Sequence, residues 1–245
     1  MTTQAHNKRN YRSLVSKHKL ETFRVVVKET DLMVRTERPL QEETTDLVLK
    51  HRMALERYIG DHPDFADRLT PCPLDLFAPP IVKTMMQAGQ KAGVGPMGAV
   101  AGAVAEYVGR DLLAYSKEVI IENGGDVFIR TTFPLTVAIL AGHSTLSGKL
   151  GVRIDSSASP VGVCTSSGTV GHSLSLGRAD AAVVVSASAA LADAAATAIG
   201  NAVSDKADVP CAIRLGEKID GVLGIVVILD DKMGVWGNVE LVRLR

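Results

Sequence analysis

The chain has 245 residues, and 46% of them are hydrophobic, which is enough to build a sizeable core in one large or two small domains. Its 27 basic residues equal its 27 acidic residues and only 4% of residues are aromatic, so neither a cationic surface nor a set of stacking rings favours nucleic acid. The three cysteines form no CxxC pair and no cluster with histidine, which indicates a reducing compartment and gives no zinc-site pattern.

The amino-terminal end shows no targeting pattern. Residues 1–19 are polar and lack the apolar stretch of a signal peptide. The longest uncharged run, residues 92–105, is too short and too rich in glycine and alanine to cross a bilayer. We therefore expect a loose basic start over about residues 1–20 and a cytoplasmic protein with no membrane partner.

The first third of the chain predicts a hairpin followed by a helix. Residues 23–27 and 32–35 are strand-like runs around a polar turn. Pro39 then opens a stretch with apolar residues at helical spacing, and Gly60 ends it. Residues 61–80 contain five prolines and are predicted to be a connection that borders a site.

The next segment predicts two helices on either side of a glycine break. They cover residues 81–90 and 96–113. The second begins with alternating glycine, alanine and valine, and Gly98 and Gly102 stand one turn apart. Either a ligand approaches that backbone closely or the helix packs tightly against the sheet.

Residues 118–122 and 126–130 predict a β-hairpin around the sequence Asn123-Gly124-Gly125. The alternative is that the two glycines let a strand pass close to a ligand, with Asp126 directed at it. Residues 134–141 and 151–154 predict further short strands, with His143 in a solvated loop between them.

Residues 164–201 hold the most informative pattern. A polar loop rich in serine, threonine and glycine leads into a buried strand over 181–185, and then into a helix of small residues that Ser188 caps and Gly200-Asn201 ends. Asp193 and Thr197 stand four residues apart on one face of this helix. A carboxylate on a packed, alanine-rich helix must meet a cation or a set of donors.

Three interpretations of this pair remain open. The first is a divalent metal held by both side chains, since hard cations prefer oxygen ligands. The second is that Asp193 favours the positive end of the helix dipole, and the third is that the Thr197 hydroxyl bonds back to the carbonyl of Asp193.

The remaining stretches, 211–215, 222–229 and 235–244, predict strands, the last two joined through residues 230–234. Strands and helices are mixed without regular β-α-β alternation. The order therefore predicts an α+β fold with largely antiparallel sheets packed with helices.

Catalytic and phosphate-binding motifs are few. The sequence Gly171-His172-Ser173-Leu174-Ser175 is similar to a nucleophile elbow, but Ser175 replaces the final glycine and a strand follows, so a serine hydrolase using Ser173 and His172 is a remote alternative. No P-loop and no dinucleotide-binding glycine pattern occurs. Residues 165–168 can still bind phosphate through amides and hydroxyls.

Four motifs occur in a recognisable order: Asn123-Gly124-Gly125-Asp126-Val127, Thr165-Ser166-Ser167-Gly168, Gly171-His172 and Ala192-Asp193-Ala194-Ala195-Ala196-Thr197. Together they resemble the ApbE-like superfamily, whose best-known members are FAD:protein FMN transferases. The residues of these motifs are most similar to those of a bacterial and archaeal branch of short cytoplasmic chains, and the resemblance covers about residues 95–201. It implies a single ApbE-like domain over residues 1–245.

The resemblance also implies a site. In the transferases a magnesium ion is held by the equivalents of Asp193, Thr197 and the backbone carbonyl of Ala101; it bridges the FAD pyrophosphate while a threonine hydroxyl of an acceptor protein takes FMN and AMP leaves. Asp193 and His172 would be the catalytic residues. The flavin nucleotide would be lined by Gly124, Gly125, Asp126, Thr165, Ser166, Ser167, Gly168 and His172. Partners would be a nucleotide or flavin ligand, an acceptor protein and, from the glycine/alanine surfaces and strand edges, a second copy in a homodimer.

The chain departs from the transferase pattern at three places. It lacks the longer amino-terminal lobe with its Met-Gly-Thr start, it has Gly102-Ala103 where the transferases have a Lys-Gly step, and it lacks their Pro-x-Thr-Gly segment after the histidine. Two functions follow as alternatives: a metal-dependent FMN transferase, or a ligand-binding or assembly protein that uses the same pocket without turnover.

Overall fold

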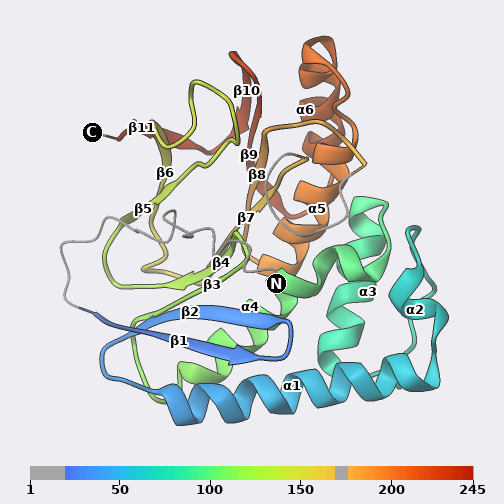
Figure 1. Cartoon of the computed structure of the whole chain (residues 1–245), viewed down its shortest axis with the longest axis vertical. Helices are drawn as coiled ribbons and strands as arrows, with labels where there is room; N and C mark the ends of the chain where they lie inside the picture. The colour runs from blue at the N-terminus through green and yellow to red at the C-terminus, as the bar shows by residue number, and fades with distance from the viewer. Residues whose placement is uncertain (1–19, 169–175, 245) are drawn as a thin grey trace, which may run out of the picture.

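The computed structural model describes residues 20–168 and 176–244 (Figure 1). In chain order the elements are β1 (Glu21–Val27), β2 (Thr30–Thr36), α1 (Gln41–Asp61), α2 (Asp64–Asp67), α3 (Pro80–Ala92), the 3-10 helix η2 (Pro96–Ala99), α4 (Val100–Leu112), β3 (Val119–Asn123), β4 (Asp126–Arg130), β5 (Leu135–Ala138), β6 (Leu150–Ile154), β7 (Val161–Ser166), β8 (Ala181–Ser186), α5 (Ala189–Asn201), the 3-10 helix η3 (Lys206–Asp208), α6 (Val209–Glu217), β9 (Val222–Leu229), β10 (Lys232–Gly237) and β11 (Glu240–Arg243).

The strands form two antiparallel sheets. The larger has eight strands in the order β1-β2-β3-β4-β7-β8-β9-β10, and the smaller has the order β11-β6-β5. This confirms the predicted α+β class. The two hairpins expected near the amino terminus and around Asn123-Gly124-Gly125 are present as β1–β2 and β3–β4.

Apolar side chains fill the space on both faces of the large sheet. Alternate residues of a strand point to opposite faces, and in β8 Ala182 and Val184 face the helices while Val183 and Val185 face the small sheet. Figure 1 shows the same layering, with helices on one side of the large sheet and β5, β6 and β11 on the other. Because its central strands are buried on both faces, the large sheet is the shared wall of two cores.

Helices α4 and α5 lie against the middle strands with almost no side chain between them. A Cβ atom on Gly102 would lie 2.3 Å from the carbonyl oxygen of Ala189, and one on Gly162 would lie 2.4 Å from the Cα atom of Ala189. The backbones of α4 and β7 therefore both lie in direct contact with the backbone of Ala189, the first residue of α5. At Gly102 the close neighbour is another helix, α5, and not the sheet against which tight packing was predicted.

A carboxylate of α4 also fixes the start of α5. Glu106 is buried, accepts the Ser188 hydroxyl at 2.8 Å and the Ala190 N–H at 3.2 Å, and pairs with Arg110 at 2.8 Å. Because these donors belong to the first turn of α5, the two helices are tied in register.

The strand predicted over residues 211–215 is wrong, because these residues belong to α6. The alternation in Cys-Ala-Ile-Arg-Leu is strand-like, but Pro210 stands in the first turn of a helix and Asp205 forms a capping box with Asp208 just before it. The buried residues Val209, Ala212 and Gly216 follow helical spacing.

Two other strand predictions need correction. The single strand predicted over 235–244 is divided at Gly237 (φ 80°), so that β10 pairs with β9 in the large sheet and β11 pairs with β6 in the small one. The polar loop predicted from Cys164 begins instead as β7, which pairs on both sides, with β4 and β8. Residues 161–163 pair with β4, and the pairing with β8 continues through the polar residues 165–166 and outweighs their composition.

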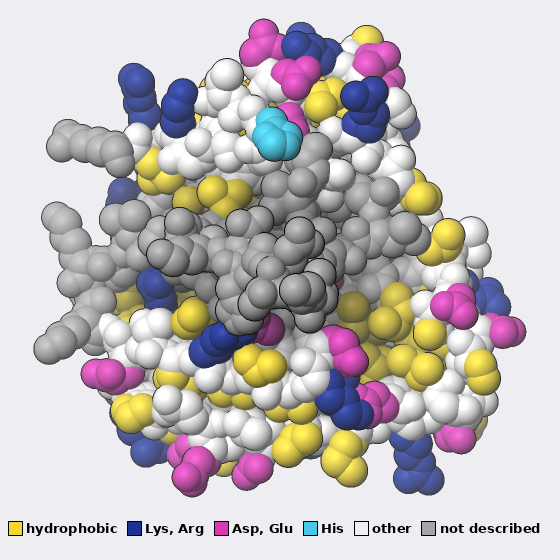
Figure 2. Space-filling model, viewed as in Figure 1, with side chains coloured by type: hydrophobic (Ala, Val, Ile, Leu, Met, Phe, Trp, Pro, Cys, Tyr) yellow, Lys and Arg dark blue, Asp and Glu magenta, His cyan; other side chains and the backbone are white. Residues whose placement is uncertain are grey.

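Charged side chains of both signs are interspersed over the face shown in Figure 2, in keeping with the zero net charge. Among the described helices, none combines the length and the apolarity that crossing a membrane requires.

Candidate functional site

Helix α5 is buried along most of its length and is partly exposed on one face. Ser188 caps it, since its Oγ accepts the Leu191 N–H at 3.3 Å, as the sequence predicts, but the helix runs on through Asn201. From Ala189 to Gly200 every residue is buried except Asp193 and Thr197, which are half-exposed. The two polar side chains of this helix therefore share an accessible position.

The Asp193 carboxylate is met by the first turn of α4. The Gly102 N–H donates to Asp193 Oδ2 at 2.9 Å, and the Ala101 N–H also bonds the carboxylate. N–H groups in the first turn of a helix have no partner within the helix and carry its positive end. The set of donors that the sequence requires for Asp193 is thus present, at the amino end of a second helix rather than of its own.

A second carboxylate lies beside it. Asp126, at the start of β4, is buried, and its Oδ1 has no hydrogen-bond partner within the described residues. The Asp126 carboxylate accepts the Thr165 N–H and can also accept the Cys164 thiol. The Cys164 Sγ lies 3.2 Å from the Ala189 carbonyl oxygen, a second acceptor for the same thiol. The single thiol proton serves one of these two acceptors at a time.

Asp126 is buried and Asp193 is only partly exposed, so loss of solvent opposes the ionisation of both carboxyls. Loss of solvent is the main reason why the pKa of Asp193 is raised well above its usual range, and the neighbouring Asp126 carboxylate adds to it, against the lowering by the Gly102 and Ala101 N–H groups. Burial likewise raises the pKa of the Asp126 carboxyl and of the Cys164 thiol. Neither carboxylate has a side-chain cation among its described contacts, so the pair lacks positive charge.

Two backbone carbonyls close the same region. The Thr197 hydroxyl donates to the Gly98 oxygen at 3.4 Å, so the described bond of this hydroxyl goes to η2 and not back to the carbonyl of Asp193. The Asn123 side-chain amide donates to the Ala101 oxygen at 3.0 Å. Asn123 was not among the predicted site residues, because an asparagine before two glycines is typical of a hairpin turn.

The glycine turn and the end of β7 border these groups. Gly124 (φ 67°) and Gly125 (φ 114°) form the tight β3–β4 turn, and a Cβ on Gly125 would lie 3.6 Å from the Thr165 carbonyl oxygen. A Cβ on Gly200 would lie 3.3 Å from Ser166 Oγ. The structure thus brings the turn and the Thr165-Ser166 strand end next to each other and next to α5.

The other predicted site residues lie at the edge of the described structure or beyond it. Ser167 is half-exposed and Gly168 is exposed, after the end of β7. His172, expected as a catalytic residue, and Ser173 of the hydrolase alternative fall within residues 169–175, outside the described residues.

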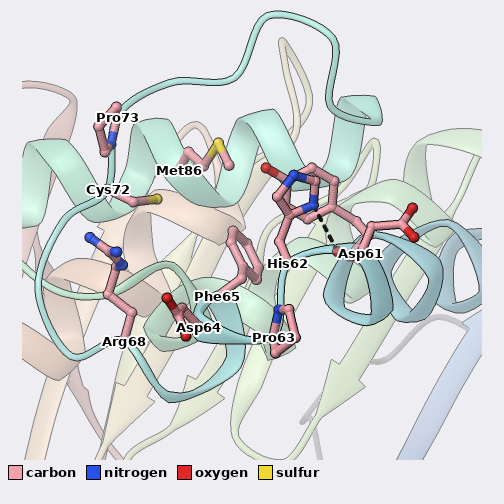
Figure 3. Close-up of a pocket in the computed structure, with 10 residues that line it drawn as sticks. Asp61, His62, Pro63, Asp64, Phe65, Arg68, Cys72, Pro73 and Met86 are labelled. Atoms are coloured by element: carbon pink, nitrogen blue, oxygen red, sulfur yellow. Dashed lines mark hydrogen bonds between the residues drawn. The ribbon is translucent and has the colours of Figure 1, made fainter.

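A separate cavity of about 390 Å³ lies beside the proline-rich connection (Figure 3). It is lined by Tyr58, Asp61, His62, Pro63, Asp64, Phe65, Arg68, Cys72, Pro73 and Met86. The His62 ring stacks on Tyr58 with centroids 4.2 Å apart, so part of its aromatic wall is already covered. It contains none of the predicted site residues, and its charged residues are solvent-exposed, so the buried carboxylate pair is the stronger candidate for chemistry.

We expect the metal-free protein to lose stability as the pH rises from about 4 to 7. The pKa of Asp126 rises from 3.8 to about 7, so in this range the folded state binds a proton that the unfolded state has released. For one proton the slope is at most about 1.4 kcal/mol per pH unit. Urea unfolding in EDTA at several pH values, for the wild type and for Asp126→Asn, measures it.

The substitution Asp126→Asn should reduce this slope, because an amide does not titrate and only the raised pKa of Asp193 then still contributes. The exposed Asp64→Asn is the matched control and should keep the wild-type slope. Equal slopes in all three proteins would show that Asp126 ionises normally in the folded state.

Proteins of similar sequence span nearly the whole chain. The family model described as AbpE bacteria matches residues 12–220. The UPF0280 protein of Methanocaldococcus jannaschii is 40% identical over 227 residues, which cover 90% of this chain and 92% of that protein. The UPF0280 protein of Methanocella arvoryzae is 40% identical over 227 residues, covering 91% of each.

Two solved structures share the fold. The flavinyl transferase ApbE of Pseudomonas stutzeri, in its apo form, superimposes with a TM-score of 0.56 at 15% identity, over 89% of this chain and 94% of that chain. The flavin transferase ApbE of Vibrio cholerae gives a TM-score of 0.55 at 11% identity, over 89% and 97%. At these identities the likeness establishes the architecture alone.

Proposed function

Because this chain belongs to the ApbE-like family, in the branch of the UPF0280 proteins, we propose that the carboxylates of Asp126 and Asp193 bind a flavin nucleotide through a divalent cation. The specific reaction proposed is transfer of FMN from FAD to an acceptor protein. It draws on the family, on the shared fold with two flavin transferases, and on the chemistry of the site.

The observation that carries the proposal is that the neighbouring carboxyls of Asp126 and Asp193 have no cation among their described contacts. The pKa of each is raised, mainly by loss of solvent, with Glu122 adding to the effect at Asp126 and Asp126 adding to it at Asp193, and one oxygen of Asp126 has no partner among the described residues. A divalent cation would satisfy this oxygen and favour the ionised form of both carboxyls. Residues of this chemistry fit a hard cation such as Mg²⁺, which prefers oxygen ligands.

The side chains alone do not complete a coordination shell. Among the described residues no group of three or more His, Cys, Asp and Glu side chains could hold a metal. Mg²⁺ sites commonly use one or two carboxylates and complete the shell with waters and substrate phosphates. We therefore propose Asp193, the Thr197 hydroxyl and the Ala101 carbonyl as ligands, with Asp126 next to them, and leave the remaining positions to the ligand and water.

When bound, the cation would neutralise charge on the FAD pyrophosphate, so that AMP would leave more readily when the acceptor hydroxyl attacks the FMN phosphorus. The chain itself would supply the binding surface. Gly124 and Gly125 present backbone without side chains, and residues 165–168 present amides and hydroxyls for phosphate. We also propose that His172 contributes to this surface and to catalysis, as its family position implies.

We further propose that the described residues act as one domain, because both apolar cores lie on the two faces of the same eight-stranded sheet.

A thermal-shift titration with FAD, FMN, ATP and AMP, each with and without Mg²⁺, tests the proposal. We expect FAD with Mg²⁺ to raise the melting temperature, by a shift that corresponds to about 2.7 kcal/mol at a ligand concentration 100 times its Kd. FAD without Mg²⁺ should have little effect. If no flavin shifts the transition with or without Mg²⁺, the flavin assignment is wrong.

One observation favours the alternative of a binding protein without turnover. The transferases that the sequence resembles have lysine where this chain has Gly102, and here even a Cβ at that position would lie 2.3 Å from the Ala189 carbonyl oxygen. The missing cation therefore has no room at this place. Release of AMP from FAD in the presence of an acceptor separates the two functions: a transferase releases AMP, and a binding protein shifts its melting temperature but releases none.

A further inference from the structure

The carbonyl oxygen of Ala101, a proposed metal ligand, is already fully occupied in this structure. Ala101 is the second residue of α4, where its oxygen accepts the N–H of the residue four positions on. Its other lone pair accepts Asn123 Nδ2 at 3.0 Å. A carbonyl oxygen has two lone pairs, so a cation can use this one only if a hydrogen bond is given up.

The orientation of the Asn123 carboxamide follows from its partner. A backbone carbonyl can only accept, so the group that faces Ala101 must be the amide nitrogen and not the amide oxygen. Of the two bonds to the Ala101 oxygen, the one inside α4 is held by the helix and by packing on α5. The other bond comes from Asn123, the last residue of β3, whose side chain is half-exposed. This is the bond that can open.

We propose that Asn123 is a latch on the metal site, whose amide must leave the Ala101 carbonyl before a cation can bind there. This inference rests on the proposed metal site and adds its regulation. Asn123 stands opposite Asp126 in the β3–β4 register and directly precedes Gly124, so the latch belongs to the turn that borders the proposed nucleotide surface. A ligand that moves this turn thereby changes the affinity for the cation, and the cation changes the affinity for the ligand by the same factor.

Mn²⁺ binding to the full chain, followed by the electron paramagnetic resonance signal of the free ion, tests the latch. The substitution Asn123→Leu keeps the approximate shape of the side chain and removes the donor. Because one competing hydrogen bond is lost, we expect Asn123→Leu to bind Mn²⁺ about threefold to tenfold more tightly than the wild type. Asn238→Leu, an exposed asparagine in the β10–β11 connection, is the matched control and should bind as the wild type does.

The direction of the change in Mn²⁺ affinity tests the proposed latch. Asn123→Leu binding that is equal to the wild type or weaker overturns the latch, since an asparagine that supported the carbonyl as a ligand would cost about 10- to 100-fold when removed. In that case wild-type Mn²⁺ binding still upholds the proposed metal site. If neither protein binds Mn²⁺, the metal site itself is wrong and the latch falls with it.

A measurement on the wild type adds a readout that does not depend on the metal affinity of the variant. The side-chain amide signals of Asn123 are assigned in the ¹⁵N spectrum of the wild type by triple-resonance experiments. Addition of Mg²⁺ should move them toward the positions of solvent-exposed asparagines. Signals that stay in place while Mg²⁺ binds contradict the latch.

Discussion

The substitution Asp193→Asn is expected to abolish divalent-cation binding while leaving the fold intact. It removes a proposed ligand, so the affinity for Mn²⁺ should fall by more than the roughly 10- to 100-fold that loss of an outer partner costs. The amide keeps one oxygen for the Gly102 N–H, which donates to Asp193 Oδ2 at 2.9 Å, and therefore preserves the contact between α4 and α5. Electron paramagnetic resonance of Mn²⁺ measures the binding, and FAD with Mg²⁺ should no longer shift the melting temperature.

The same variant should be more stable than the wild type when no metal is present. An amide stays neutral at every pH, whereas loss of solvent raises the pKa of Asp193, so the gain in the free energy of unfolding should grow as the pH rises. Urea unfolding in EDTA measures it, with Asp64→Asn as the exposed control. Retained Mn²⁺ binding in Asp193→Asn would remove this residue from the metal site, and a variant that does not fold would make Asp193 mainly structural.

The substitution Gly102→Ala is expected to have the largest effect on stability. Its new Cβ would lie 2.3 Å from the Ala189 carbonyl oxygen and 2.8 Å from the Cβ of Asp193, so α4 and α5 must move apart. Overpacking of this kind costs about 1–3 kcal/mol, and here the backbone atom cannot rotate away. The movement also draws the Gly102 N–H off Asp193, so cation affinity should fall together with the free energy of unfolding.

Gly60→Ala is the matched control for this substitution. Gly60 lies near the end of α1, and a Cβ there meets no atom within 4 Å. Alanine in a helix should stabilise the protein by about 0.5–1 kcal/mol. Urea unfolding of both variants separates the clash at Gly102 from the general effect of replacing glycine, and equal stability of Gly102→Ala and the wild type would show that this glycine does not set the distance between the helices.

The antiparallel α+β class and the helix of Asp193 and Thr197 could be predicted from sequence because their signals are local. Strand-like runs around polar or glycine-containing turns mark each hairpin, Ser188 marks the start of α5, and two polar residues stand out against alanine. Local signals misled where tertiary packing decided the outcome. Residues 211–215 alternate like a strand yet lie in α6, and the polar residues 165–166 pair with β8.

The electrostatics of the site could not be predicted in this way. Asp126 meets Cys164 and Asp193 only because β4 pairs with β7, two strands that β5 and β6 separate in the sequence. The bond between Asn123 and the Ala101 carbonyl likewise joins residues 22 positions apart through the packing of α4 on β3. Neither the spacing nor the residue types of these groups carries information about such contacts.

The strand order of the large sheet has a consequence for how the protein acquires its site. Neighbouring strands in that sheet are consecutive in the chain except at one place, where β4 pairs with β7 and β5 and β6 lie between them in the sequence. Closing this longer loop costs chain entropy before any contact repays it, so we expect the β3–β4 hairpin to form before β4 pairs with β7. The carboxyls of Asp126, on β4, and of Asp193, on α5, which packs on β7, come together across this join. We therefore expect the cation site to be complete only once this join has formed, so that the separate hairpins do not hold a cation.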